Sequence, residues 1–140
     1  MQNAQPPDNK GVYVIRVKKR GKVVKGMMEE VRRAVENLKW DIVGKRILNR
    51  IDRLIRINKC PLIYIGSAGT QEGNRKTLKK RYEEFSGRHT AMFPIWALVY
   101  FGWELEFGWK KTKNPRDAED KLKRKYKKQH GNRLPALVGK

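Results

Sequence analysis

The sequence predicts an α+β fold, in which helices surround a small sheet. Three segments, at residues 11–17, 62–66 and 103–109, have the β-branched, aromatic or alternating composition of strands. Between and after them, apolar residues recur at three- and four-residue steps, which is the period of an amphipathic helix. The chain has 140 residues and no internal repeat, so we expect one compact domain.

Local composition predicts the elements of the first half. Residues 1–10 are polar and contain proline, which indicates a flexible lead to a single domain at residues 11–140. After the first strand, Gly21 predicts a turn with a short return strand at Val23 and Val24. The helical period then holds over residues 28–57, where Gly44 predicts a break between two amphipathic helices.

The second half alternates strands and helices. After the strand at residues 62–66, Thr77 is the predicted N-cap of a helix that ends near Gly87. Residues 90–101 are typical of a buried helix with Pro94 in its first turn. The third strand precedes a helix from residue 115 or 116 to about residue 130, and we expect the tail to pack as coil or not at all.

Charge is the strongest compositional signal. The 34 Lys and Arg outnumber the 14 Asp and Glu, which gives a formal net charge of +20. Such a chain repels itself unless a polyanion neutralises part of the charge, so nucleic acid is the expected partner and an anionic membrane surface is the alternative.

No segment reaches membrane-spanning length, and the first ten residues lack a signal-peptide pattern. With Cys60 as the single cysteine, an intrachain disulfide is excluded, and we expect a soluble cytoplasmic protein.

Two of the predicted strands carry a tyrosine beside a glycine, in "GVY" at residues 11–13 and "YIG" at residues 64–66. Either tyrosine alone is better explained as a core aromatic. If the two strands are neighbours, both phenols lie at one edge of the sheet. The small residues after Tyr64 would then leave room for a phosphate backbone and a metal ion to approach.

Five features in this order resemble the GIY-YIG endonuclease family, which includes phage homing endonucleases, some restriction enzymes and the incision subunit of bacterial excision repair. They are the two tripeptides, Arg81 in the helix after the second strand, Glu119 in the last helix and Asn132 beyond it. The most specific stretch is "YIGSA" followed by "LKKRYEEF", and "DAEDKLKRKY" is similar to the family's glutamate helix. Three departures stand out: residues 28–57 replace a short hairpin, the loop between Gly66 and Arg81 is longer than usual, and Phe85 stands where some members carry a histidine.

The resemblance implies a mainly antiparallel three-stranded sheet flanked by helices, with residues 28–57 as an inserted helical pair. It also implies hydrolysis of phosphodiester bonds in DNA with Mg²⁺ or Mn²⁺. Glu119 is the implied metal ligand, and Gly11 and Gly66 are the motif glycines. The implied catalytic residues are Tyr13, Tyr64, Arg81, Glu119 and Asn132.

The chemistry of phosphodiester cleavage explains why these residue types belong together. Attack on phosphorus builds negative charge on the phosphoryl oxygens, which a fixed guanidinium such as that of Arg81 stabilises. A single carboxylate such as Glu119 is enough to hold Mg²⁺, because this ion keeps most of its waters. Tyr13 or Tyr64 would position the attacking water and take its proton. An ordinary phenol has a pKa of about 10, so the second role requires nearby positive charge.

Arg81 and Glu119 also have ordinary interpretations. Arg81 follows Lys79 and Lys80, which fits a solvated basic face. Glu119 fits a helix salt bridge with Lys123, four residues later.

The polar residues near the predicted helix ends are equally open. Asn132 follows Gly131 and fits a residue that ends the last helix. His89 is expected to contact phosphate or to cap a turn. His89 and His130 lie far apart in a chain without a cysteine pair, which is weak support for a zinc site.

The sequence-based hypothesis is therefore a metal-dependent DNA endonuclease. The alternatives are a catalytically idle nucleic-acid-binding module on the same fold and an RNA-directed nuclease. The inserted helices must bury their apolar stripe against the domain or against a second copy of the chain. The residues expected to contact nucleic acid are Ser67, Lys80, His89, Arg46, Arg50 and Arg53.

Overall fold

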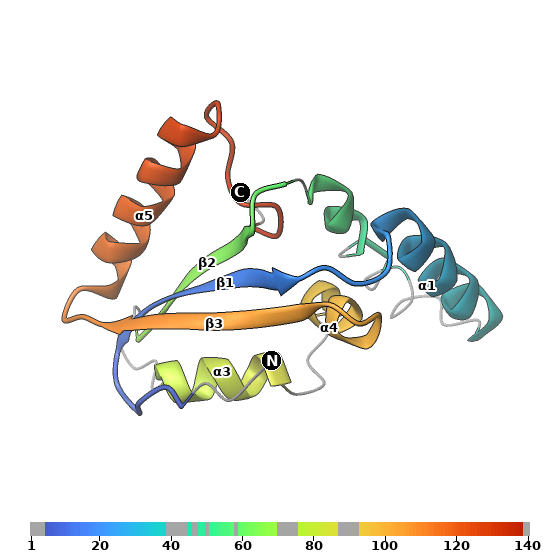
Figure 1. Ribbon diagram of the computed structural model, residues 1–140. Helices are drawn as coiled ribbons and strands as arrows, with labels where there is room; N and C mark the ends of the chain where they lie inside the picture. The colour runs from blue at the N-terminus through green and yellow to red at the C-terminus, as the bar shows by residue number, and fades with distance from the viewer. Residues whose placement is uncertain are drawn as a thin grey trace.

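The computed structural model describes residues 5–38, 45, 48–49, 51–57, 59–69, 76–86 and 93–138. Three strands form one sheet in the order β2-β1-β3, and both pairs are antiparallel. The strands are β1 (Gly11–Lys19), β2 (Leu62–Ala68) and β3 (Glu104–Lys111), so the strands predicted at residues 11–17, 62–66 and 103–109 are confirmed. The α+β class with a three-stranded antiparallel sheet is thereby confirmed (Figure 1).

Helices surround this sheet (Figure 1). They are α1 (Val24–Leu38), the short 3-10 helix η1 (Asp52–Arg56), α3 (Leu78–Ser86), α4 (Phe93–Tyr100) and α5 (Pro115–Gln129). In Figure 1, α3 lies below the sheet and α5 rises above it, while α1 lies at the opposite end from α5. The predicted helices after Thr77, around Pro94 and after Asn114 are therefore present.

The predicted return strand at Val23 and Val24 is wrong. Val24 begins α1, and the N–H of Met27 donates to the carbonyl of Val23 over 3.1 Å. The helix places Met27, Met28 and Val31 against the core, where each is at most 9% exposed. A two-residue strand could not bury these side chains, so the helical period prevails. The predicted break at Gly44 lies outside the described residues.

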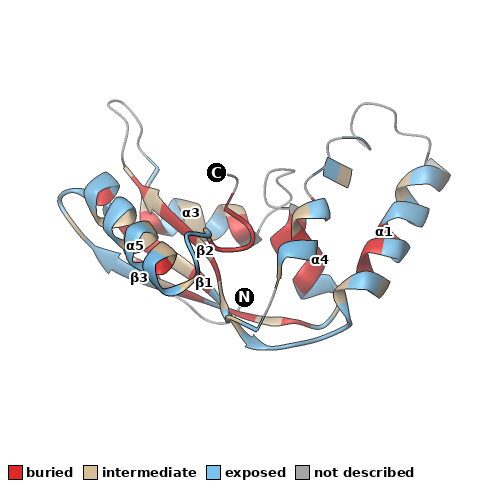
Figure 2. Ribbon diagram, turned by 90° about the horizontal axis from the view of Figure 1, so that it is seen from above, coloured by how far each residue is buried: buried red, intermediate tan, exposed pale blue. Residues whose placement is uncertain are grey.

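The main core lies on the face of the sheet that α3 covers. Tyr13 and Ile15 of β1 belong to it, together with Leu78 and Phe85 of α3 and Phe107 of β3. Residues that alternate to the other face of β1 and β2, such as Val12 and Ile65, are also buried, and α5 packs against these two strands. Figure 2 shows the buried residues following the strands and the inner sides of the helices.

Residues 7–9, part of the expected flexible lead, are hydrogen-bonded to the start of α3. The N–H groups of Leu78 and Lys79 donate to the carbonyls of Asn9 and Pro7, over 2.9 and 3.1 Å. The Lys80 N–H donates to the Thr77 hydroxyl oxygen over 3.3 Å, which confirms Thr77 as the N-cap. The first turn of α3 thus has partners for backbone donors that a helix leaves unsatisfied.

The tail packs as coil. Residues 135–138 are buried, and the Leu137 N–H donates to the Ile63 carbonyl beside β2 over 2.9 Å. No helix in the described part of the chain is both long enough and apolar enough to span a membrane.

Candidate active site

Tyr13 and Tyr64 lie side by side on the sheet. The register sets Tyr13 opposite Gly66 and Ile15 opposite Tyr64, so these residues share one face. The two phenol rings are nearly parallel, with centroids 6.0 Å apart and an interplanar angle of 18°. Phe85 packs edge-on against both rings at 5.6 and 5.8 Å and is itself part of the apolar core.

Gly66 makes this pairing of tyrosines sterically feasible. A Cβ at residue 66 would lie 2.5 Å from the Tyr13 hydroxyl and 2.9 Å from Cε1 of Tyr64. Any side chain would therefore displace the Tyr13 phenol. The expectation that this small residue leaves room for a phosphate is wrong at Gly66, because the ring of Tyr13 fills the space.

Gly11 has a different role at the same end of the sheet. A Cβ at residue 11 would lie 2.5 Å from Cδ1 of Leu78 in α3. The glycine thus allows the first turn of α3 to pack directly against the start of β1. This packing brings α3 close to the tyrosine pair.

The phenol of Tyr13 is held neutral. Its side chain is 3% exposed, and this burial is the largest cause that raises the pKa of Tyr13 above its usual range. The charge of Tyr64, a hydrogen bond between the two phenols and the charge of Glu119 raise the pKa further, while the Arg81 guanidinium lowers it. Tyr64, which is half-buried, is therefore the more accessible of the two phenols.

Arg81 differs from the lysines before it. Its side chain is 22% exposed, whereas that of Lys80 is 65% exposed and lies 3.9 Å from Glu83. The guanidinium donates to Glu84 over 3.3 Å, and its Nε is buried without a hydrogen-bond partner among the described residues. Buried donors in proteins are nearly always satisfied, so the guanidinium retains unused hydrogen-bonding capacity next to Tyr13.

Glu84 is the carboxylate that compensates the charge of Arg81. Its burial raises the pKa, but the hydrogen bonds and charges of Lys76 and Arg81 outweigh this effect and hold the pKa of Glu84 below its usual value. Lys76 approaches the other carboxylate oxygen to 2.7 Å. Glu84 is therefore ionised and fixed between two cations.

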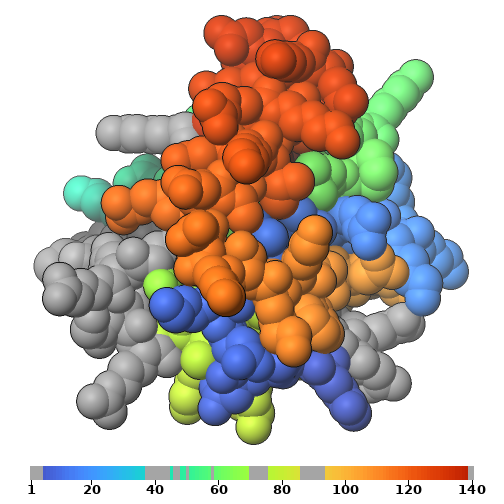
Figure 3. All heavy atoms as spheres, turned by 90° about the vertical axis from the view of Figure 1, so that its left-hand side faces the viewer, coloured from blue at the N-terminus to red at the C-terminus, as the bar shows by residue number. Residues whose placement is uncertain are grey.

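Glu119 lies in the second turn of α5. Its side chain is 20% exposed and accepts a hydrogen bond from Lys123 over 3.1 Å, so the ordinary i,i+4 salt bridge is present. The same carboxylate also acts electrostatically on Tyr13. Tyr64, Arg81 and Glu119, from β2, α3 and α5, thus all lie close enough to Tyr13 of β1 for their charges to act on its phenol. Figure 3 looks onto one end of the sheet, where α5 (red) lies above the end of β3 and the following turn (orange) and above residues 5–10 (blue).

The chemistry of the available donors decides which ion would fit here. Within the described ranges, no group of three or more His, Cys, Asp and Glu side chains is arranged to hold a metal. Glu119 supplies one carboxylate beside the phenols. Mg²⁺ binds proteins through one or two carboxylates and keeps several waters, so Glu119 suits a hydrated Mg²⁺ or Mn²⁺ ion but not a zinc-type cage.

Asn132 does not join this group. It follows α5 with a positive φ of 63°, and its N–H donates to the Lys127 carbonyl over 2.9 Å. Gly131 before it has a φ of 60°, so the two residues form the left-handed end of the helix. The helical residues from Glu119 to Gln129 alone separate the two positions by about 15 Å. The structure therefore supports the helix-ending interpretation of Asn132.

The other predicted contact residues are spread over the chain. Ser67 pairs with Val12, on the face of the sheet opposite Tyr13, and Arg53 is half-buried in η1. Lys80 is exposed on α3. His89, Arg46 and Arg50 lie outside the described residues.

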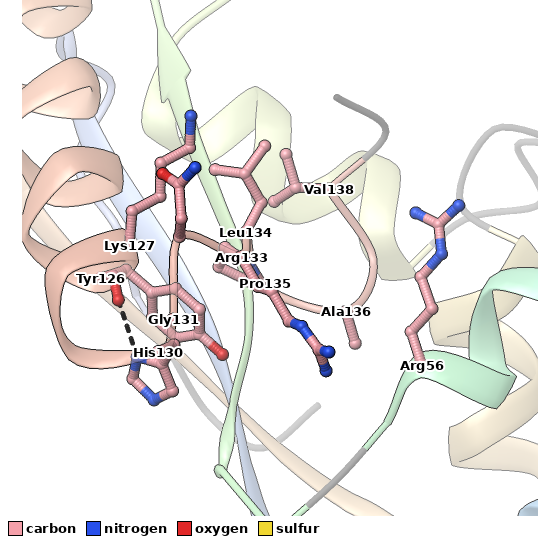
Figure 4. A pocket seen from close by; sticks show the side chains of 11 residues that line it. Arg56, Tyr126, Lys127, His130, Gly131, Arg133, Leu134, Pro135, Ala136 and Val138 are labelled. Carbon is pink, nitrogen blue, oxygen red and sulfur yellow. Dashed lines mark hydrogen bonds between the residues drawn. The ribbon is translucent and has the colours of Figure 1, made fainter.

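A hollow at the far end of α5 was not predicted. It encloses about 730 Å³ between η1, the end of α5 and the following loop (Figure 4). Arg56, Lys127, His130 and Arg133 contribute its charged and titratable lining. Lys127, His130 and Arg133 recur at three-residue steps, which was the available sequence signal, but Arg56 reaches this place only through the fold.

No protein-family model, curated protein or solved structure matches the chain.

Proposed function

We propose that this chain is a GIY-YIG-type endonuclease that hydrolyses phosphodiester bonds of DNA with Mg²⁺ or Mn²⁺. The observation that carries the proposal is the electrostatic environment of the buried Tyr13. Tyr64, Arg81 and Glu119 come from three other elements, and all three act on the ionisation of Tyr13. Perturbed ionisable groups gathered from distant parts of a chain are typical of functional sites.

Arg81 is the proposed phosphate ligand. Its guanidinium is held by Glu84 and surrounding side chains, so binding a phosphate oxygen costs little side-chain entropy. A fixed cation stabilises the charge that develops on the phosphoryl oxygens as the water–phosphorus bond forms and the bond to the leaving oxygen breaks.

The two tyrosines take different roles in this proposal. Tyr64 is the accessible phenol and positions the attacking water. Tyr13 stays neutral, because its pKa is raised, and its hydrogen bond orients the Tyr64 hydroxyl. Tyr13 is thus a positioning residue.

Glu119 is the proposed ligand of the metal ion. When bound, the ion would act as a Lewis acid on the scissile phosphate. Glu119 must then release or share its contact with Lys123, whose ammonium remains close enough to bind a neighbouring phosphate.

One observation favours the idle binding module as the second candidate. Both Glu119 and Arg81 already have ion-pair partners, Lys123 and Glu84, which a non-catalytic protein would simply retain. The net charge of +20 suits nucleic-acid binding in either case.

A cleavage assay separates these candidates. Supercoiled plasmid, branched DNA and RNA are incubated with the protein in Mg²⁺, in Mn²⁺ and in EDTA. We expect nicking or cutting of DNA with either ion and none in EDTA. Binding without cleavage of any substrate would establish the idle module, cleavage of RNA alone would establish the RNA nuclease, and cleavage in EDTA would contradict the role of the metal.

A further inference from the structure

The hollow at the end of α5 is lined by cations without compensating carboxylates. Arg56 approaches from η1, and Lys127 and Arg133 approach from α5 and its following loop. Figure 4 shows this loop on one side and Arg56 on the other, with the Arg133 side chain extending into the space between them. No Asp or Glu of the described chain lines the hollow.

These three cations make no ion pair with any carboxylate that the structure describes. Three like charges around one hollow repel one another and concentrate positive potential there. An anion would relieve that repulsion. The hollow is therefore suited to a negatively charged group.

The loop that carries Arg133 is fixed in place. The His130 ring stacks on Tyr126 with a centroid distance of 3.7 Å, and its Nδ1–H donates to the Tyr126 carbonyl over 2.8 Å. The N–H of Arg133 donates to the His130 carbonyl over 3.2 Å. Because the Arg133 N–H is already hydrogen-bonded, an anion would be held by the side chains that this ordered loop presents.

A second hollow lies next to the first, along α5. It encloses about 610 Å³ along α5 and shares Lys127 and Leu134 with the first hollow. Lys121, Lys123 and Arg124 line it, together with Asp117 and Asp120. The cations therefore continue along α5 towards the turn that carries Glu119.

The spacing along α5 matches a nucleic-acid strand. The eight residues from Glu119 to Lys127 rise by about 12 Å in a helix. One strand of B-form DNA advances about 3.4 Å per nucleotide. A strand cut at Glu119 would thus present a phosphate three to four nucleotides away, close to Lys127.

We propose that the hollow lined by Arg56, Lys127 and Arg133 is a distal phosphate site, which binds a backbone phosphate of DNA about three to four nucleotides from the bond that is cut. The cationic side of α5 binds the phosphates between them. This inference rests on the proposed nuclease function for the location of the cut. The binding of phosphate itself does not depend on cleavage.

The test measures DNA binding by fluorescence anisotropy in EDTA, so that no substrate is consumed. The triple variant Arg56→Gln, Lys127→Gln, Arg133→Gln is compared with the wild-type chain and with Lys19→Gln, Lys25→Gln, Arg33→Gln. The control removes three exposed cations from the opposite end of the sheet. We expect the first variant to bind on the order of tenfold to a hundredfold more weakly, with the slope of log K against log salt reduced by up to about 2.7, and the control to change little.

A neutral methylphosphonate scanned along the duplex locates the contact. Substitution three to four nucleotides from the cut should weaken binding by the wild-type chain but have little further effect on the triple variant.

If the triple variant does not fold, the single variant Arg133→Gln is measured in its place. Its expected change in salt slope is about one-third of that of the triple variant. Wild-type affinity and slope in the triple variant would overturn the distal phosphate site while leaving the nuclease proposal intact. Weakened binding by a protein that cuts no DNA would support the phosphate site and overturn the nuclease proposal.

Discussion

The helices α1 and α5 each have fifteen residues and lie at opposite ends of the sheet, yet they differ in charge (Figure 1). Helix α1 has three cations and three carboxylates, whereas α5 has seven cations and three carboxylates. Around α1 the charges are compensated, since Arg32 lies 2.6 Å from Asp52 and Glu30 pairs with Lys22. On α5 the structure shows an ion pair for Lys123, with Glu119.

The two helices also differ in what they bury. Met27, Met28 and Val31 of α1 are core residues, while the buried residues of α5 are Pro115 and Tyr126. Helix α1 is thus an ordinary amphipathic helix whose stability comes from packing. Helix α5 keeps an exposed, uncompensated basic surface, which is a cost to a free protein and an advantage to one that binds a polyanion. Seven cations and three carboxylates give α5 a net charge of +4, whereas the three of each on α1 cancel.

A large effect is expected at Arg81 of α3. Arg81→Ala should reduce the cleavage rate by several orders of magnitude, because it removes a fixed cation from the developing charge. Lys80→Ala, which removes the exposed neighbouring cation, should have a much smaller effect. Single-turnover rates on the same duplex provide the measurement. Equal, mild losses of cleavage rate in both variants would indicate that Arg81 is only one of the exposed cations on α3.

The tyrosine pair is expected to show intermediate effects. Tyr64→Phe should lower the cleavage rate with folding unchanged, because the hydroxyl that positions water is lost. Tyr13→Phe should lower the rate less and cost about 1 kcal/mol of stability, because it removes the hydrogen bond between the phenols. Rates and chemical denaturation are measured on both variants. Wild-type rates in both would make the tyrosines core residues only.

The smallest effect is expected on binding, where the insertion is compared with α5. Neutralising Arg46, Arg50 and Arg53 in the insertion should weaken binding to all DNA sequences, with a slope change of up to about three phosphate contacts. Neutralising Lys121, Arg124 and Lys125 on α5 should reduce the salt slope more, since the structure shows no carboxylate paired with these side chains. A larger change in salt slope for the insertion variant than for the α5 variant would contradict this prediction. If the insertion variant behaves as wild type, the insertion serves packing or self-association, which sedimentation of the wild-type chain would reveal.

Much of the fold was predictable, because it depends on local patterns. Alternation and β-branched residues predicted the three strands, and Thr77 predicted the start of α3. The helix at Val24 was missed because two adjacent valines also resemble a strand, and only the burial of Met27 and Met28 decides between them. The hydrogen bonds of residues 7–9 to α3 join segments about seventy residues apart in sequence, and no local pattern encodes them.

The candidate site was predictable in kind but not in detail. The two tripeptides identified Tyr13 and Tyr64, but their different exposure depends on Gly66 and on packing by Phe85. Gly131 followed by Asn132 is a helix-ending signal, and the structure favours that interpretation over a place beside Glu119. The distal hollow requires η1 to approach the loop after α5, which sequence spacing alone could not show.

Glu119→Gln tests the central claim most directly, because it neutralises the proposed metal ligand and nearly preserves its shape. Cleavage of plasmid DNA in Mg²⁺ and binding in EDTA are measured side by side for the wild-type chain, for Glu119→Gln and for the control Glu30→Gln on α1. We predict that Glu119→Gln binds DNA at least as tightly as the wild-type chain but does not cut it, while Glu30→Gln cuts normally. Full cleavage by Glu119→Gln would contradict the assignment of this end of the sheet as a metal-dependent active site.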